Sequence, residues 1–164
     1  MNRLQIDRIN DSSAYDVKYN DHGAIVFDTD YGVRYAVTFD EGENPFFTAY
    51  WFNLTNLNNK PSPGDSKVAQ TVICIIEEFF RQNPEILLYM CSTSDGLQAQ
   101  RARLFLRWFN GAKQRELYFI RATEVKGEDC AEYVAVIVQR NNPNLENIIA
   151  RFDADVAMFN EMKP

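Results

Sequence analysis

The stretch SKVAQTVICIIEEFFRQNPEILLYM, residues 66–90, decides how the chain folds. In its first part the apolar residues recur every three or four positions and fall within about 160° of helical arc. Asn83 and Pro84 end this pattern, because the residue before a proline disfavours helical backbone. The apolar run over residues 86–91 then has the length and the boundaries of a buried, parallel-type strand. The stretch therefore predicts a helix followed by a core strand.

Upstream of this helix, apolar and polar residues alternate, which is the pattern of half-buried strands. Turn-forming sequences such as NDHG, TDYG and DEGENP separate the alternating segments. Four strands are expected, over residues 14–19, 24–28, 33–39 and 46–54. The loop NNKPSPGD then leads into the helix, and either Ser62 or Asp65 is expected to cap it.

Downstream of the core strand the sequence predicts a second helix, which ends near residue 109. Asp95 and Gln98 have the spacing of a capping box at its start. Its expected core face is made by Leu97, Leu104, Phe105 and Trp108. Arg101 lies between the apolar residues of this face, whereas Gln100, Arg103 and Arg107 share another face.

The chain is expected to close with two strands and a third helix. The strands cover residues 115–125 and 131–139, and Asn142 before Pro143 starts a helix with an apolar stripe from Leu145 to Phe159. The predicted fold is α+β, with a mostly antiparallel sheet of about seven strands, three helices and the order ββββ-α-β-α-ββ-α. We expect one domain over residues 1–164, because domains commonly run to ~100–200 residues.

Composition narrows the functional classes. With 46% hydrophobic residues among 164, the chain can bury one sizeable core. A net charge of −6 argues against nucleic-acid binding, which needs cations to displace counterions from phosphates. The start of the chain lacks a signal-peptide pattern, and no apolar run approaches the ~20 residues of a membrane span. The sequence therefore predicts a cytoplasmic protein that binds neither membranes nor nucleic acids.

Histidine and cysteine usage excludes several kinds of catalytic site. His22 is the only histidine and is expected on the surface of a turn, so no metal site or histidine-dependent triad is expected. Cys74, Cys91 and Cys130 are odd in number and far apart, which does not make a disulfide framework. Cys91 is expected to be a buried core cysteine. Glu77 and Glu78 are expected on the solvated face of the first helix.

Positive charge is concentrated between residues 96 and 115. This segment has no acid and holds five of the 17 cations, which leaves 12 cations against 23 acids elsewhere. The five cations are Arg101, Arg103, Arg107, Lys113 and Arg115. Three interpretations stay open: a solvated face, a face neutralised by acidic neighbours, or a surface for an acidic partner.

Arg101 needs a partner, because an unpaired charge on an apolar helix face is costly to bury. One interpretation is a structural ion pair with Asp95 or with an acid on the strands. The other is a bound anion, which Arg101 would hold together with Ser92, Thr93 and Ser94 at the start of the helix, where free N–H groups are available.

Two resemblances support the order of elements. SDGLQAQRARLFLRWF, set between EEFFRQNPEILLYMC and a following strand, resembles a family of small uncharacterised bacterial proteins, a domain of unknown function. The order of strands and helices is similar to that of the GNAT (N-acetyltransferase) superfamily. That second resemblance implies that residues 46–54 splay open for acyl-CoA. It also implies that Lys60, Gly64, Ser66 and Lys67 bind its pyrophosphate.

The GNAT resemblance carries over only in part. The family's loop has paired glycines, whereas Gly64 stands alone here beside Asp65, and the family's general-acid tyrosine falls near Leu104 or Phe105. Whether the chain is an enzyme therefore stays open. The first hypothesis is a non-catalytic GNAT-like domain without a cofactor that binds an acidic small molecule or protein partner. Its ligand-binding residues would be Ser92, Thr93, Ser94, Asp95 and Arg101. The alternative is an acyl-CoA-dependent N-acyltransferase.

Overall fold

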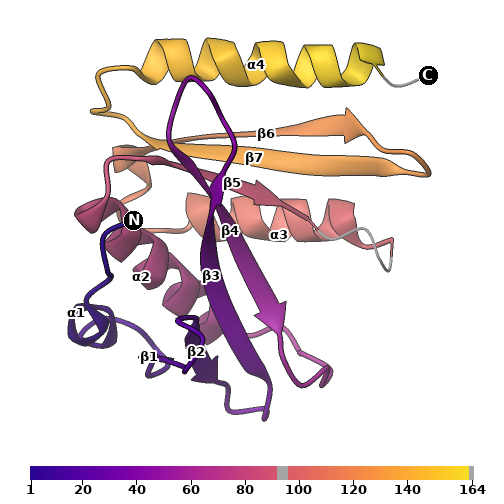
Figure 1. The fold of residues 1–164 in the computed structure, drawn as a ribbon. Helices are drawn as coiled ribbons and strands as arrows, with labels where there is room; N and C mark the ends of the chain where they lie inside the picture. The colour runs from indigo at the N-terminus through magenta and orange to yellow at the C-terminus, as the bar shows by residue number, and fades with distance from the viewer. Residues whose placement is uncertain (92–95, 163–164) are drawn as a thin grey trace. The chain divides into compact units, whose positions relative to one another are not determined.

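The computed structural model describes residues 1–91 and 96–162. Over these residues the fold is mixed α+β, with a seven-stranded sheet and four α-helices, three of which have more than seven residues (Figure 1). This confirms the predicted fold class. The helices are α1 (Ile6–Asn10), α2 (Ser66–Gln82), α3 (Gln98–Asn110) and α4 (Leu145–Met162), with a short 3-10 helix, η1 (Arg115–Leu117). The strands are β1 (Lys18–Tyr19), β2 (Ile25–Asp28), β3 (Arg34–Gly42), β4 (Ala49–Asn56), β5 (Ile86–Met90), β6 (Tyr118–Lys126) and β7 (Ala131–Gln139).

The predicted order holds, with three differences. Helix α1 precedes the first strand and was not expected. The first strand is reduced to Lys18–Tyr19, because Tyr15 and Val17 are buried in extended chain outside the sheet. Residues 115–117, expected in a strand, form η1, in which the backbone N–H of Leu117 donates to Gln114.

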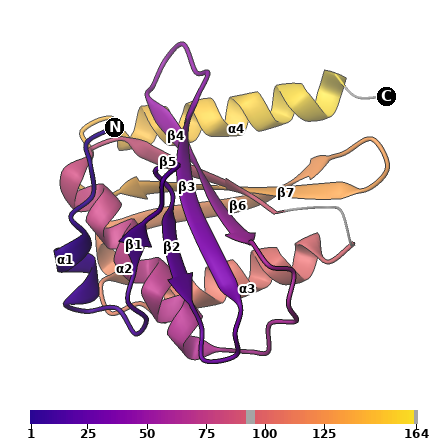
Figure 2. The ribbon, with the colours of Figure 1, turned by 60° about the horizontal axis from the view of Figure 1, so that its bottom comes forward.

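The chain divides into two compact units, so the predicted single domain stays a prediction. Unit 1 comprises Met1–Asp40 and Phe52–Pro84, and unit 2 comprises Glu41–Trp51 and Glu85–Pro164. In unit 1 the strand order is β1-β2-β3-β4, and the β1–β2 and β2–β3 pairs are antiparallel. Helix α1 lies against α2, which packs its apolar side on the strands (Figure 2). Phe79 of α2 stacks on Phe39 with ring centroids 4.9 Å apart.

A buried carboxylate joins the N-terminal segment to α2. Glu78 is fully buried, so the prediction that it is solvated is wrong. Its Oε1 accepts hydrogen bonds from the backbone N–H of Gln5 at 3.0 Å and from Gln82 Nε2 at 2.9 Å. Its Oε2 accepts from the Arg81 guanidinium. Both oxygens thus have partners, which is the condition under which a carboxylate is tolerated in a core.

In unit 2 the strand order is β4-β5-β7-β6, and β7 pairs antiparallel with both β5 and β6. Helices α3 and α4 cover opposite faces of these strands (Figure 1). Residues 134–138 of β7 are all buried. On the α4 side, Val136 and Val138 pack with Ile148. The sheet of unit 2 is therefore the middle layer of three.

Helix α3 turns a different face to the sheet from the one predicted. Its buried residues are Gln98, Ala102, Phe105 and Phe109. Leu97 and Leu104, expected in the core, are 47% and 41% exposed, and Trp108 is half-buried. Phe105 stacks on Tyr89 of β5 with centroids 4.1 Å apart, and Phe109 meets Tyr118 of β6 edge-on. The two phenylalanines, one turn apart, thus decide which face is buried.

The start of α3 also differs from the predicted capping box. Leu97 occupies the N-cap position and offers no side-chain hydrogen bond. Gln98 points inward instead, where its Nε2 donates to the carbonyl of Ala131 at 2.9 Å. Asp95, the other half of the predicted box, lies outside the described residues.

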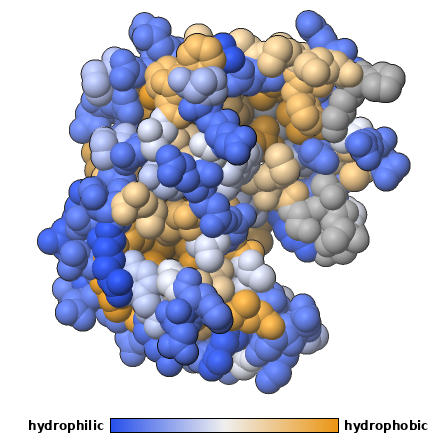
Figure 3. All heavy atoms as spheres, in the orientation of Figure 1, coloured by the Kyte–Doolittle hydropathy of each residue, from blue (hydrophilic) through white to orange (hydrophobic). Residues whose placement is uncertain are grey.

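Helix α4 begins as predicted, and Leu145, Ile148 and Phe152 of its stripe pack in the core, but Phe159, predicted in the same stripe, is exposed. Asn142 Oδ1 accepts from the N–H of Asn144 just before the helix begins. Met158, Phe159 and Met162 are exposed, and Figure 3 shows apolar side chains over the C-terminal half of α4. Among the described residues, no helix combines the length and the apolar character needed to cross a membrane.

The Glu78 contacts give a first prediction. We expect Glu78→Ala to lower the free energy of unfolding by about 3 kcal/mol, because it removes a buried carboxylate and leaves the donors of Gln5 and Gln82 without their acceptor. Glu77→Ala, at the half-buried neighbouring position, is the matched control and should cost less than about 1 kcal/mol. Urea denaturation followed by circular dichroism measures both. Equal losses in the two variants would contradict the anchoring role of Glu78.

Candidate functional site

A tight turn between β2 and β3 presents Asp30 and Tyr31. The N–H of Gly32 donates to the carbonyl of Thr29 at 3.1 Å, and Thr29 Oγ1 accepts from the N–H of Val33 at 3.2 Å. Gly32 has a φ of 74°, a left-handed conformation that costs glycine little. Thr29 is buried, whereas Asp30 and Tyr31 are exposed. The turn formed by the sequence TDYG therefore determines the backbone positions from which Asp30 and Tyr31 project.

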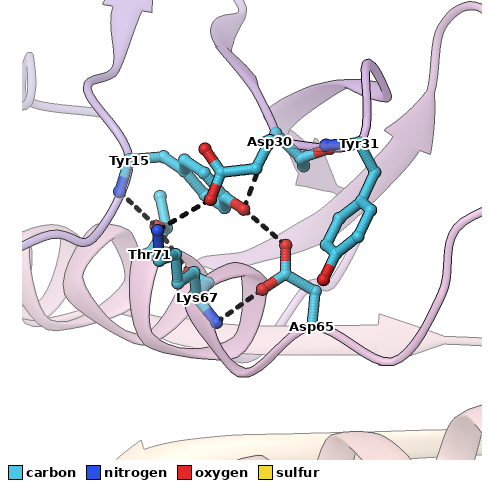
Figure 4. A network of polar contacts seen from close by, with 7 residues as sticks. Tyr15, Asp30, Tyr31, Asp65, Lys67 and Thr71 are labelled. Carbon is cyan, nitrogen blue, oxygen red and sulfur yellow. Dashed lines mark hydrogen bonds and ion pairs between the residues drawn. The ribbon is translucent and has the colours of Figure 1, made fainter.

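Asp30 meets the start of α2 in a network of polar contacts (Figure 4). Asp65 caps α2: its Oδ1 accepts from the N–H of Lys67 at 3.0 Å, and its Oδ2 accepts from the Tyr15 hydroxyl at 2.5 Å. The Tyr15 oxygen in turn accepts from the N–H of Asp30 at 3.2 Å. Lys67 Nζ lies 2.7 Å from Asp30 Oδ2. Of the two caps that the sequence left open, the structure selects Asp65.

The electrostatics of this network keep Tyr15 neutral. Burial raises the pKa of Tyr15 above its ordinary value of 10.0, and the hydrogen bond to Asp65 raises it further. Asp30 raises the pKa of Lys67 through their hydrogen bond. Tyr15 is thus a hydrogen-bond donor at neutral pH and has no free base beside it. The network connects three segments of unit 1, and the hydroxyl of Tyr15 within it is not activated as a nucleophile.

The residues expected to bind pyrophosphate lie around the same helix start. Lys60, Gly64, Ser66 and Lys67 are all exposed. The charge of Lys67 is paired with Asp30, and the side chain of Asp65 already accepts from an N–H group that a phosphate would use. Cofactor binding by these four residues stays a prediction.

The second group of predicted site residues belongs to unit 2. Arg101 lies on α3 and is half-buried. Burial raises the pKa of Cys91 and of Tyr89, and in each case the charge of Arg101 acts in the opposite direction. The charge of Arg101 is therefore close enough to the end of β5 to act on both groups. The remaining predicted ligand-binding residues lie outside the described residues: Ser92, Thr93, Ser94 and Asp95.

Three exposed cations of the acid-free segment have no carboxylate partner among the described residues. Arg103, Arg107 and Lys113 are exposed, and within residues 1–91 and 96–162 none of them lies within 4.0 Å of a carboxylate. Several other arginines do have such partners. Those pairs are Arg34 with Asp28, Arg121 with Asp153, and Arg151 with Asp155. The positive charge of Arg103, Arg107 and Lys113 is thus left to solvent or to a ligand.

Neither Cys91 nor His22 forms part of a reactive centre among the described residues. Cys91 is 2% exposed, which confirms it as a core residue, and its raised pKa disfavours the thiolate. His22 is exposed. In the part of the chain that the structure describes, no three histidine, cysteine or acidic side chains are grouped to hold a metal ion.

Sequence reasoning missed the Tyr15–Asp30–Asp65–Lys67 network as a unit. Asp65 was recognised as a cap and Lys67 as a candidate ligand, but Tyr15 was assigned to a strand. Its partners lie 15 and 50 positions away in the chain. No local pattern reports a contact across such distances, so only the fold could reveal it.

Comparison with known proteins places the chain in a family. A family model described as "Family of unknown function (DUF6169)" matches residues 64–154, more than half of the chain, so the chain belongs to this family. The matched residues include the acid-free cationic segment but exclude Tyr15 and Asp30. Comparisons with curated proteins and with solved structures found no match.

The network gives a second prediction. Tyr15→Phe removes the donor to Asp65 and leaves the Asp30 N–H unpaired, so we expect a loss of about 2 kcal/mol of unfolding free energy at pH 7. Since the folded-state pKa of Tyr15 is raised, its contribution is complete below pH 10.0 and is lost as pH rises through that higher pKa. Urea denaturation at several pH values measures this.

Tyr31→Phe is the matched control, because Tyr31 is 58% exposed. It should change stability by less than about 0.5 kcal/mol at every pH. A loss as large as that of Tyr15→Phe would show that the phenol–carboxylate contact is not what stabilises this region.

Proposed function

We propose that this chain is a binding domain that uses the cationic side of α3 to hold an acidic ligand or an acidic protein partner. The observation that carries the proposal is the exposed pair Arg103 and Arg107, which have no carboxylate within reach among the described residues. Four of the five cations in residues 96–115 are exposed, and no acid interrupts them.

The charge of the whole chain makes this arrangement informative. A protein with a net charge of −6 has acids in excess, and several of its other arginines, such as Arg34 and Arg121, pair with them. Exposed charges that are not paired within their own chain attract opposite charges from solution and orient them before contact. The cationic side of α3 is therefore the part of unit 2 best suited to acidic groups.

Arg101 is proposed as the inward-facing member of this site. Its helix position lies between the exposed Leu97–Leu104 side and the buried Phe105 side, and its charge acts on Cys91 and Tyr89. An anion at the start of α3 would meet Arg101 first, with Arg103 and Arg107 on the outer side.

A GNAT-like relationship, a bacterial origin and a cytoplasmic location remain proposals from the sequence. The order α2, β5, α3, β6, β7 is compatible with the first of them. Acyl-CoA transfer has less support than anion binding. Asp65 caps the start of α2, where the pyrophosphate would bind, and Leu104 and Phe105, near the position of the general-acid tyrosine, cannot donate a proton.

The third prediction tests the outer cations. We expect Arg103→Ala with Arg107→Ala to weaken binding of a fluorescein-labelled oligo-glutamate peptide by about tenfold at low salt, since each exposed ion pair contributes up to ~1 kcal/mol. Melting should hardly change, because both side chains are exposed. Fluorescence anisotropy and thermal melting measure the two effects.

The control for this double variant is Arg8→Ala with Lys18→Ala, which removes two exposed cations from unit 1 and changes the net charge equally. It should bind the peptide nearly as well as the unmodified protein. An equal loss would attribute binding to overall charge, and the absence of any binding would reject the proposed function.

The fourth prediction tests Arg101. If Arg101 faces a bound anion, Arg101→Met should weaken binding of the same peptide at least as much as Arg103→Met while changing stability by less than about 1 kcal/mol. Urea denaturation and anisotropy are compared for the two variants. A destabilisation of about 3 kcal/mol or more by Arg101→Met alone would identify a buried structural pair. Arg101 would then not be a residue of the proposed binding site.

A further inference from the structure

A surface hollow lies where α3, η1 and the β6–β7 ladder meet in unit 2. Its volume is about 330 Å³, at the lower end of the range for small-molecule pockets. It is lined by residues from all of these elements, among them Phe109, Arg115, Glu116, Tyr118, Phe119 and Arg140. All of them belong to unit 2 and to the segment that the family model matches.

Two arginines line this hollow, Arg115 from η1 and Arg140 from the position directly after β7. Arg115 Nη1 lies 3.4 Å from the carbonyl oxygen of Asn110 at the end of α3. The Arg140 guanidinium carbon lies 5.9 Å from the centre of the Phe119 ring. The backbone N–H of Arg140 donates to the carbonyl of Leu117. Neither arginine is in an ion pair within the described ranges. Each guanidinium has five N–H donors, so most remain available.

Several of the last carbonyls of α3 accept hydrogen bonds, which weakens the negative end of the helix beside this hollow. Among the last carbonyls of the helix, that of Arg107 accepts from Gly111, that of Phe109 accepts from Ala112, and that of Asn110 accepts from Arg115. Arg121, the other cation above Phe119, is paired with Asp153. Glu116 is the one acid among the lining residues, against two arginines.

The remaining lining is aromatic. Phe119 is half-buried and lines the hollow together with the buried Tyr118 and Phe109, whose rings meet edge-on with centroids 6.4 Å apart. An aromatic base with arginines at its rim suits a ligand that has a flat apolar body and an anionic group, because rings stack on rings and guanidinium forks bind carboxylate or phosphate.

We propose that this hollow is a site for a small aromatic anion, with Arg115 and Arg140 binding its phosphate or carboxylate and Phe119 contacting its ring. The site is separate from the outer cations Arg103 and Arg107. It would let unit 2 respond to a small molecule independently of any acidic partner bound at α3.

Titration of the full-length protein with phenyl phosphate, followed by ¹H–¹⁵N NMR, tests the proposal. We expect the backbone amide signals of Arg115, Phe119 and Arg140 to shift together and to saturate with a dissociation constant of about 1 mM or below. Inorganic phosphate should bind more weakly, because it lacks the ring, and benzoate should bind in the same place. Shifts that do not saturate, or that appear elsewhere, overturn the proposal.

Variants separate this site from general attraction to positive charge. Arg140→Ala and Arg115→Ala should each weaken phenyl phosphate binding by about tenfold, as expected for loss of a charge-assisted contact. Arg8→Ala removes an exposed arginine of unit 1 that has no carboxylate partner among the described residues, and it should leave phenyl phosphate binding unchanged. Because all three side chains are exposed, the melting temperature should be preserved and checks the fold. Equal weakening by Arg8→Ala would reject the site even if the oligo-glutamate peptide still bound α3.

Discussion

Strand β7 imposes the arrangement of unit 2. Five consecutive residues, 134–138, are buried, so both faces of the strand must be covered. Val136 and Val138 meet α4 on one side, and α3 covers the other, while β5 and β6 satisfy the backbone at both edges. Once β7 is enclosed in this way, the aromatic pairs Phe105–Tyr89 and Phe109–Tyr118 settle how α3 lies. Arg103 and Arg107 are exposed as a consequence of that packing.

Much of the fold could be predicted, because its signals are local. Periodicity located α2, β7 and α4, and the cap at Asp65 was among the alternatives. The errors arose where partners far away in the sequence decide the outcome. The α3 pattern predicted a core face with Leu104, whereas contacts with β5 and β6 bury the face with Phe105 and Phe109. Glu78 looked solvated because its partner Gln5 is 73 residues away.

The candidate site was predictable in its charge and less so in its geometry. The acid-free run that ends at Arg115 is visible in the sequence, and the structure adds that Arg103 and Arg107 are exposed and without carboxylate neighbours among the described residues. The contrast with unit 1 is instructive. There, Asp30, Asp65 and Lys67 satisfy one another, so charge stabilises the fold. On α3, Arg103 and Arg107 have no such pairing among the described residues, so their charges are available for binding.

The two helices of unit 2 also separate charge across the sheet that they enclose. Helix α3 carries three arginines and no acid, whereas α4 carries four acids and one arginine. Unit 2 therefore has an electric dipole moment along the normal of its own sheet. The field of a negatively charged molecule that approaches unit 2 exerts a torque on this dipole, which turns the α3 side toward the molecule before contact. Such steering acts on the rate of encounter more than on the lifetime of a complex, and it fades as ionic strength shortens the Debye length to ~8 Å near 0.15 M.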